Sequence, residues 1–246
     1  MSGVAVFLIA VGCADILRRL VPRAWPAVLA GPVVAIATAA LCGLWHLGDL
    51  VLVGIAAVAA ALWEVTCARA ERLGGRRQIW PLVLFGTVLA VLVLLSGLGS
   101  DVGGPVAAWA RWVALPGLAT VDPGRIVMVI AVVLLQLVTG NQLVRLLLGS
   151  VGSVKPAGQP QASDRLKGGR LLGPMERLLI LGLSLAGQLA AATAVVAAKS
   201  IIRFPEINAQ KARENGGIGI DDVTEYFLVG SFASWIVALG GLALAQ

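Results

Sequence analysis

Charged residues are scarce in this chain of 246 residues. Asp, Glu, Lys and Arg make up 13% of it, whereas 59% of the residues are hydrophobic. Soluble domains carry about 25% charged residues, and a water-soluble core does not hold this much apolar surface. The composition therefore excludes an ordinary soluble protein and predicts an all-α polytopic integral membrane protein. A β-barrel is disfavoured because the apolar stretches are continuous and do not alternate.

Residues that carry metal or nucleophile chemistry are also few. The chain has three cysteines, Cys13, Cys42 and Cys67, and one histidine, His46. Their spacing matches neither a metal site nor a disulfide framework, so we expect no metal and no cofactor. The sequence contains no P-loop, no nucleophile elbow and no paired Asp-rich motif for magnesium diphosphate. An enzyme is therefore the weaker expectation.

Seven apolar runs fill most of the chain. A helix needs about 20 apolar residues to cross a bilayer, and the first run is the shortest of the seven. The runs cover residues 4–17, 26–47, 50–66, 79–98, 126–148, 174–202 and 226–245. The sequence therefore predicts about seven transmembrane helices.

The segments between these runs suggest a division into parts. Residues 149–173 are rich in Gly, Ser, Pro and Gln, which predicts a flexible cytoplasmic loop. This loop separates a front part of five spans, residues 1–148, from a back part of two spans, residues 174–246. Residues 99–124 hold two tryptophans and an arginine, which predict a short helix at the level of the headgroups.

The net charge of +6 is distributed unevenly between the loops. Arginines and lysines cluster after the first, third and fifth runs, and seven crossings put these clusters on one side. The positive-inside rule makes that side the cytoplasm. We expect a bacterial plasma membrane protein with its N-terminus outside and its C-terminus in the cytoplasm. Because the basic clusters alternate with apolar runs, we expect no nucleic-acid partner.

The sixth run is the most informative. Between Arg177 and Lys199 it has 21 residues without a formal charge, which is enough to cross the membrane as one helix. Small residues recur every four positions in this run and in the seventh: Gly182, Ala186, Ala190, Ala194 and Ala198, then Gly230, Ser234 and Ala238. Such stripes let two helices approach closely in lipid. We expect these two runs to pack as a close antiparallel pair.

The outer ends of this pair carry residues that suit an anion. Lys199, Ser200 and Arg203 follow the sixth run, and Glu225 and Tyr226 begin the seventh. Two cations against one glutamate leave one positive charge over, and Lys and Arg bind phosphate or carboxylate well. The alternative interpretation is a buried salt bridge that staples the two helices together.

A second group of polar residues lies on the cytoplasmic side of the fifth and sixth runs. Polar groups inside lipid are costly, so one interpretation is the wall of a polar cavity. The other is structural, with hydrogen bonds between helices, snorkelling of the arginine of the fifth run and a helix N-terminus. The group comprises Gln136, Asn141, Gln142, Arg145, Glu176 and Arg177.

Two further carboxylates, Asp15 and Glu64, lie near the cytoplasmic ends of the first and third runs. Neighbouring arginines are available to pair with them. Taken as lone carboxylates, they are weak grounds for proton coupling.

The back part contains three motifs: GRLLGPMERLLILGLSLAGQ, AAKSIIRFPEI and EYFLVGSFASWIVAL. With them the chain resembles an uncharacterised bacterial multi-pass membrane protein family of unknown function, whose pattern is ERLLI…AAKSIxRF…EYxLxG. The chain departs from this pattern at Ser231, where the family has Thr. The resemblance implies a multi-pass membrane fold and no particular reaction. It marks these residues: Glu176, Arg177, Lys199, Ser200, Arg203, Phe204, Glu225, Tyr226 and Gly230.

These observations predict an inner-membrane protein that binds or translocates an anionic, lipid-linked, phosphate-bearing ligand. Two alternatives stay open. One is a structural or accessory membrane subunit without its own chemistry. The other is a membrane-embedded enzyme acting on a phosphorylated lipid, with Glu225 or Glu176 as the base. The expected partners are membrane lipid and either a partner membrane protein or a second copy of the chain.

Overall fold

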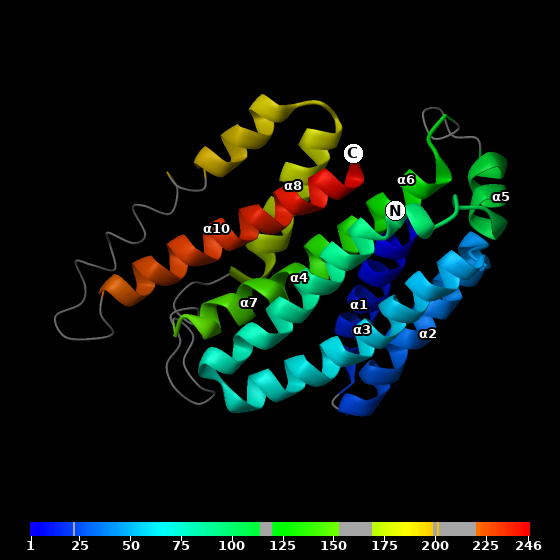
Figure 1. Cartoon of the computed structure of the whole chain (residues 1–246). Helices are drawn as coiled ribbons and strands as arrows, with labels where there is room; N and C mark the ends of the chain where they lie inside the picture. The colour runs from blue at the N-terminus through cyan, green and yellow to red at the C-terminus, as the bar shows by residue number, and fades with distance from the viewer. Residues whose placement is uncertain (22, 114–119, 153–168, 199–200, 202–219) are drawn as a thin grey trace.

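The computed structural model describes residues 1–21, 23–113, 120–152, 169–198, 201 and 220–246. Every regular element in these ranges is a helix (Figure 1), which confirms the predicted all-α class. The front part contains α1 (Ser2–Leu20), α2 (Ala24–Cys42), α3 (Leu47–Leu73), η1 (Gly75–Gln78), α4 (Ile79–Leu94), η2 (Ser96–Leu98) and α5 (Gly104–Val113). It continues through α6 (Pro123–Leu134), the π-helix η3 (Leu135–Thr139) and α7 (Gly140–Ser150). The back part contains α8 (Gly169–Leu185), a short helix (Leu189–Ala198) and α10 (Ile220–Ala245).

Five helical segments in the described ranges are long and apolar enough to cross a membrane. They are Trp25–Cys42, Leu47–Leu73, Gly75–Leu94, Pro123–Ser150 and Glu225–Ala245. With 19 residues, α2 rises about 28 Å, close to the hydrocarbon thickness of about 30 Å. The chain is therefore consistent with a multi-pass membrane protein, whereas the prediction of seven spans is not confirmed.

The first run forms the central helix of the front part rather than a span that faces lipid. Val4, Ala10 and Ala14 of α1 are fully buried, and α1 contacts α2, α3, α6 and η3. A Cβ added to Gly3 would lie only 2.9 Å from Leu52 Cβ, so the glycine lets α3 come close. A helix enclosed by other helices does not need an apolar surface on every side, which is why α1 tolerates charges near its end.

The prediction of one continuous helix over the sixth run is wrong. The helix α8 ends at Leu185, and the next helix begins at Leu189. Between them Gly187 has φ 76°, and the Gln188 N–H donates to the Leu183 carbonyl at 2.8 Å. This is the Schellman arrangement that ends many helices, and glycine adopts its left-handed conformation without steric cost. The apolar composition on both sides of Gly187 concealed the break.

The small residues of the sixth run do not form a packing seam, although the predicted contact between α8 and α10 is confirmed. The face of α8 that packs inward carries Ile180 and Leu181, both buried. In α10 the small residues Ser234 and Ala238 are buried as expected. The antiparallel prediction depended on a continuous sixth helix, which the described chain does not form. The exposed stripe consists of Gly182, Ala186, Ala190, Ala194 and Ala198.

Both described chain ends lie at the same end of the bundle (Figure 1). The Ser2 hydroxyl donates to the Ser100 carbonyl at 3.2 Å, and Arg125 Nε donates to the Ala245 carbonyl at 3.3 Å. These two contacts lie near each other. Gly124 precedes Arg125, Val102 follows Ser100 by two residues, and a Cβ on Gly124 would lie 3.7 Å from Val102 Cγ2. With both described ends at one end of the bundle, the prediction that they face opposite sides of the membrane is not confirmed.

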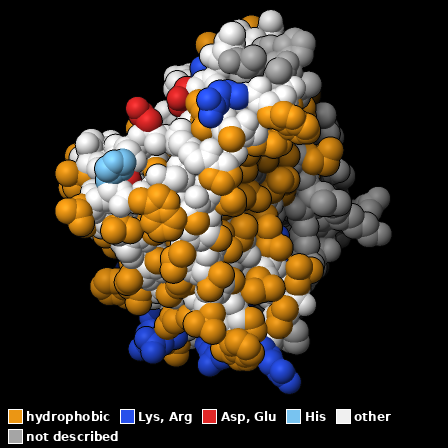
Figure 2. Space-filling view, turned by 90° about the vertical axis from the view of Figure 1, so that its right-hand side faces the viewer, with side chains coloured by type: hydrophobic (Ala, Val, Ile, Leu, Met, Phe, Trp, Pro, Cys, Tyr) orange, Lys and Arg blue, Asp and Glu red, His pale blue; other side chains and the backbone are white. Residues whose placement is uncertain are grey.

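The surface divides into three zones. Figure 2 shows apolar side chains around the middle of the bundle and basic side chains at one end, and it shows acidic side chains, the histidine and further basic side chains near the other. Exposed tryptophans mark both borders of the apolar zone: Trp25 and Trp80 at the basic end, and Trp45, Trp109 and Trp112 at the other. Such aromatic belts are typical of membrane interfaces. The two tryptophans Trp109 and Trp112 lie on α5, which confirms the predicted short helix.

Candidate functional site

The first predicted site, at the ends of the sixth and seventh runs, falls mostly outside the described residues. Lys199, Ser200 and Arg203 all lie outside them. Glu225 is exposed and Tyr226 is half-buried at the beginning of the described side chains of α10. The anion site at these residues therefore stays a prediction.

The second predicted group is brought together in part, around Arg177. This arginine lies on α8 and only 1% of it is exposed. Its Nε and Nη2 donate to the Gln136 carbonyl at 3.1 and 2.8 Å, and Nη2 also donates to Asn141 Oδ1 at 2.7 Å. Its Nη1 donates to Ser234 Oγ of α10 at 3.1 Å. One guanidinium thus joins α8, α10 and the segment between α6 and α7.

The π-helix η3 explains why the Gln136 carbonyl is available to Arg177. A π-turn replaces the usual i→i+4 hydrogen bonds and leaves a backbone carbonyl free for another donor. Gly140 follows η3, and a Cβ there would lie 3.0 Å from Arg177 Nε, so the glycine makes room for the guanidinium. The Gln136 side chain in turn donates to the Val237 carbonyl of α10 at 3.0 Å.

The other members of this group have different partners. Trp235 Nε1 donates to Glu176 Oε1 at 3.0 Å, and Gln142 Nε2 donates to Glu71 Oε1 of α3 at 2.9 Å. Arg145 is exposed and takes no part in the Arg177 network. Because the Arg177 guanidinium is surrounded by protein acceptors, the structural interpretation of this group is favoured over a cavity wall. The sequence analysis did not identify Ser234 as a partner of Arg177 or Trp235 as a partner of Glu176. It considered Ser234 only as a small residue of the packing stripe.

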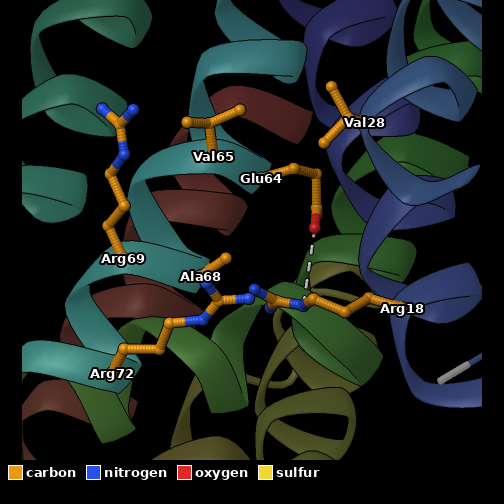
Figure 3. A pocket seen from close by; sticks show the side chains of 7 residues that line it. All are labelled: Arg18, Val28, Glu64, Val65, Ala68, Arg69 and Arg72. Atoms are coloured by element: carbon orange, nitrogen blue, oxygen red, sulfur yellow. Dashed lines mark ion pairs between the residues drawn. The ribbon is translucent and has the colours of Figure 1, made fainter. Parts of the chain in front are cut away.

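A different site opens at the basic end of the bundle, between α1, α2 and α3 (Figure 3). It is a pocket of about 190 Å³. Three of its lining residues are apolar, three are arginines and one is a glutamate. Its lining comprises Arg18 of α1, Val28 of α2, and Glu64, Val65, Ala68, Arg69 and Arg72 of α3. We refer to these seven residues as the basic pocket.

Two residues of the basic pocket, Arg18 and Glu64, belong to a buried ionic cluster with Asp15, which lies behind the lining. Arg18 Nη2 lies 2.8 Å from Asp15 Oδ1, and Arg18 Nε lies 3.5 Å from Glu64 Oε2. Trp63 Nε1 also donates to Asp15 Oδ1, at 3.2 Å. Asp15 and Arg18 share a face of α1 because they are three residues apart. The predicted pairing of Asp15 and Glu64 with a neighbouring arginine is confirmed.

The mouth of the basic pocket carries Arg69 and Arg72, which are three residues apart on α3 and exposed. Figure 3 shows the side chain of Arg72 extending toward Arg18, while Arg69 stands apart from them. Within the described part of the chain, neither Arg69 nor Arg72 has an ion-pair partner. Their charges are therefore available to a bound anion.

Three buried polar atoms of this ionic cluster lack a hydrogen-bond partner among the described residues. They are Asp15 Oδ2, Glu64 Oε1 and Arg18 Nη1. Buried polar atoms in native proteins are nearly always satisfied by protein, water or ligand. The ionic cluster beside the basic pocket therefore has hydrogen-bonding capacity that the described side chains do not complete.

No protein-family model, curated protein or solved structure matches this chain. The resemblance of the back part to the uncharacterised membrane family therefore stays a prediction, and the function is argued from the geometry of the basic pocket.

Proposed function

We propose that this protein is a bacterial plasma membrane protein that binds an anionic, phosphate-bearing lipid by its headgroup in the basic pocket. The observation that carries the proposal is that three arginines line one small pocket at the basic end, two of them without ion-pair partners in the described chain. The ligand class is the one predicted from the sequence, and the basic pocket supports it independently of Lys199, Ser200 and Arg203.

The charge balance of the basic pocket favours an anion. Arg18, Arg69 and Arg72 bring three positive charges, and Asp15 and Glu64 bring two negative ones, which leaves one positive charge over. Arginine presents a planar fork of donors that matches phosphate oxygens in pairs. A phosphate near the mouth would therefore gain charge-assisted hydrogen bonds that the protein itself does not supply.

The surroundings of the basic pocket favour an anion with an apolar tail. Val28, Val65 and Ala68 form its apolar walls. Farther toward the middle of the bundle, Val33 of α2 and Val58 of α3 are exposed in the apolar zone. A headgroup among the arginines would leave its acyl chains along these side chains. Basic pockets between helices at the cytoplasmic border are a known way to bind anionic headgroups.

The basic pocket also sets the proposed orientation. Arginines near the ends of α1, α3 and η1 gather at the same end of the bundle as the pocket, and the positive-inside rule places that end in the cytoplasm. We therefore assign the basic pocket to the inner leaflet and both described chain ends to the outer side.

The test measures the binding of phosphatidylglycerol to the full-length protein in nanodiscs of zwitterionic lipid. The double variant Arg69→Gln/Arg72→Gln is compared with Arg76→Gln/Arg77→Gln, which removes the same charge from η1 outside the pocket. We expect the pocket variant to bind at least about tenfold more weakly, because it loses charge-assisted hydrogen bonds. The control should lose only the smaller attraction of a nearby surface charge.

Two outcomes would contradict the proposal. If the two double variants lost lipid affinity equally, the loss would be explained by surface charge in general and not by the basic pocket. Competition by free inorganic phosphate as effective as that by the lipid would show that the acyl chains contribute nothing. Transbilayer movement of the labelled lipid in vesicles, measured in parallel, separates translocation from binding.

A further inference from the structure

We infer from the structure a proton-binding site at the carboxyl pair of Asp15 and Glu64, whose occupancy is coupled to that of the basic pocket. The proton site stands on the geometry of the pair, whereas the coupling rests on the proposed function.

The two carboxyl groups are buried and share one guanidinium, because Arg18 Nη2 lies 2.8 Å from Asp15 Oδ1 and Arg18 Nε lies 3.5 Å from Glu64 Oε2. Asp15 is 1% exposed and Glu64 is 2% exposed. Each has one oxygen without a donor, Oδ2 of Asp15 and Oε1 of Glu64. As long as both groups are ionised, neither carries a hydrogen that could satisfy the free oxygen of the other. One proton, taken from water and bound by the pair, would turn one of these buried oxygens into a donor.

The local charge also favours one proton. Arg18 is the one cation that pairs with both carboxylates in the described structure, so the three groups together carry a single negative charge. An uncompensated charge in a buried site is costly. Neighbouring carboxyl groups commonly share a proton for this reason, and they then titrate as a pair.

The charged and titratable groups around the pair come from the elements packed against it. Arg19 is directed elsewhere, because its Nη2 donates to the Val138 carbonyl of η3 at 3.0 Å. Val28 of α2 contributes an apolar wall, and the side chain of Thr139 of η3 lies next to Asp15. The α3 groups near the pair are Cys67, Arg69, Glu71 and Arg72. The nearest additional cations are therefore those at the mouth of the pocket.

Glu64 connects the two sites, because it belongs to the pair and also lines the basic pocket. An anion that approaches Arg18 meets the negative charge of an ionised Glu64 at the same place. A proton on the pair removes this repulsion and loosens the hold of Glu64 on Arg18, whose Nη1 already lacks a partner. Anion binding therefore takes up a proton, and by reciprocity a lower pH tightens anion binding.

The test measures phosphatidylglycerol binding to the full-length protein as a function of pH, by calorimetry in buffers of different ionisation enthalpy. We expect affinity to rise as pH falls, by up to about tenfold per pH unit where the pair titrates, with uptake of close to one proton per lipid. The variants Glu64→Gln and Asp15→Asn should each remove most of the pH dependence of the binding, whatever their affinity at a single pH. The control Glu71→Gln changes a neighbouring carboxylate that does not line the pocket, and it should keep the dependence.

A second measurement tests the proton site without the lipid. Infrared difference spectra of the full-length protein over a pH titration should show the carbonyl band of a protonated carboxylic acid, which is lost in Glu64→Gln or Asp15→Asn and kept in Glu71→Gln. Lack of this band in the wild-type protein, or its survival in both pair variants, would overturn the proton site. A band without pH-dependent lipid binding would overturn the coupling. Equal lipid binding by Arg69→Gln/Arg72→Gln and its control, with the band present, would overturn the proposed function and leave the proton site standing.

Discussion

Replacement of Arg177 by methionine should destabilise the protein more than any other single removal of an arginine from its described helices. Methionine keeps much of the side-chain volume but removes all the donors. The Gln136 carbonyl, Asn141 Oδ1 and Ser234 Oγ would each lose the guanidinium that they contact now. These groups belong to three different segments, so the loss would loosen the junction between α8, α10 and η3.

The expected magnitude follows from the number of contacts. Hydrogen bonds between membrane helices contribute on average about 0.6 kcal/mol each, so four of them give about 2.4 kcal/mol. Burial without a partner costs a polar group roughly 1–3 kcal/mol, and the Gln136 carbonyl would lose both of its guanidinium donors. We therefore expect Arg177→Met to lower the free energy of unfolding by about 2–5 kcal/mol.

The assay is reversible unfolding of the full-length protein in mixed micelles, followed by far-ultraviolet circular dichroism. Arg145→Met is the matched control, because Arg145 lies on α7 near the same cluster but is exposed. A surface substitution of this kind should change the stability by no more than about 0.5 kcal/mol. Equal stabilities of the two variants would refute the assignment of Arg177 as the residue that joins the back part to the bundle.

Two further predictions concern close packing and a helix cap. Gly140→Ala places a Cβ 3.0 Å from Arg177 Nε and should lower the melting temperature, whereas Gly182→Ala enters open space and should leave it unchanged or raise it, because alanine favours helix. Asp49→Asn weakens the cap of α3, where Asp49 Oδ2 accepts from the His46 amide at 3.2 Å, and the contacts in which Asp49 accepts from the Ser100 amide at 2.8 Å and the Ser100 hydroxyl at 2.6 Å. It should cost about 1–3 kcal/mol in the same unfolding assay, and an unchanged stability would contradict the role of this cap.

Composition and spacing were sufficient to predict the general class of this protein. Long apolar runs predicted helices, and five segments in the described chain have the length and hydropathy of spans. The arginines after the first and third runs predicted the pairing of Asp15 and Glu64 with a cation, because charges near helix ends in a membrane need partners. The tryptophans of α5 predicted an interfacial helix, because tryptophan is enriched at the borders of a membrane.

The features that failed depend on contacts that a single sequence does not display. Gly187 ends a helix inside an apolar run, and only the backbone conformation distinguishes it from Gly182, which continues one. The π-helix η3 and its contact with Arg177 require α8 to pack against α6 and α7. The basic pocket requires α1, α2 and α3 to converge, so no motif along the chain marks it. Asp15 and Glu64 looked like lone carboxylates because they lie on different helices.

An experimental density map of the full-length protein in a bilayer that contains phosphatidylglycerol tests most directly whether the basic pocket binds a lipid headgroup. The account predicts phosphate density between Arg18 and Arg72, with acyl-chain density leading from it along α2 and α3. A basic pocket that holds only water in that bilayer, with the Arg72 side chain turned toward lipid elsewhere, would contradict it.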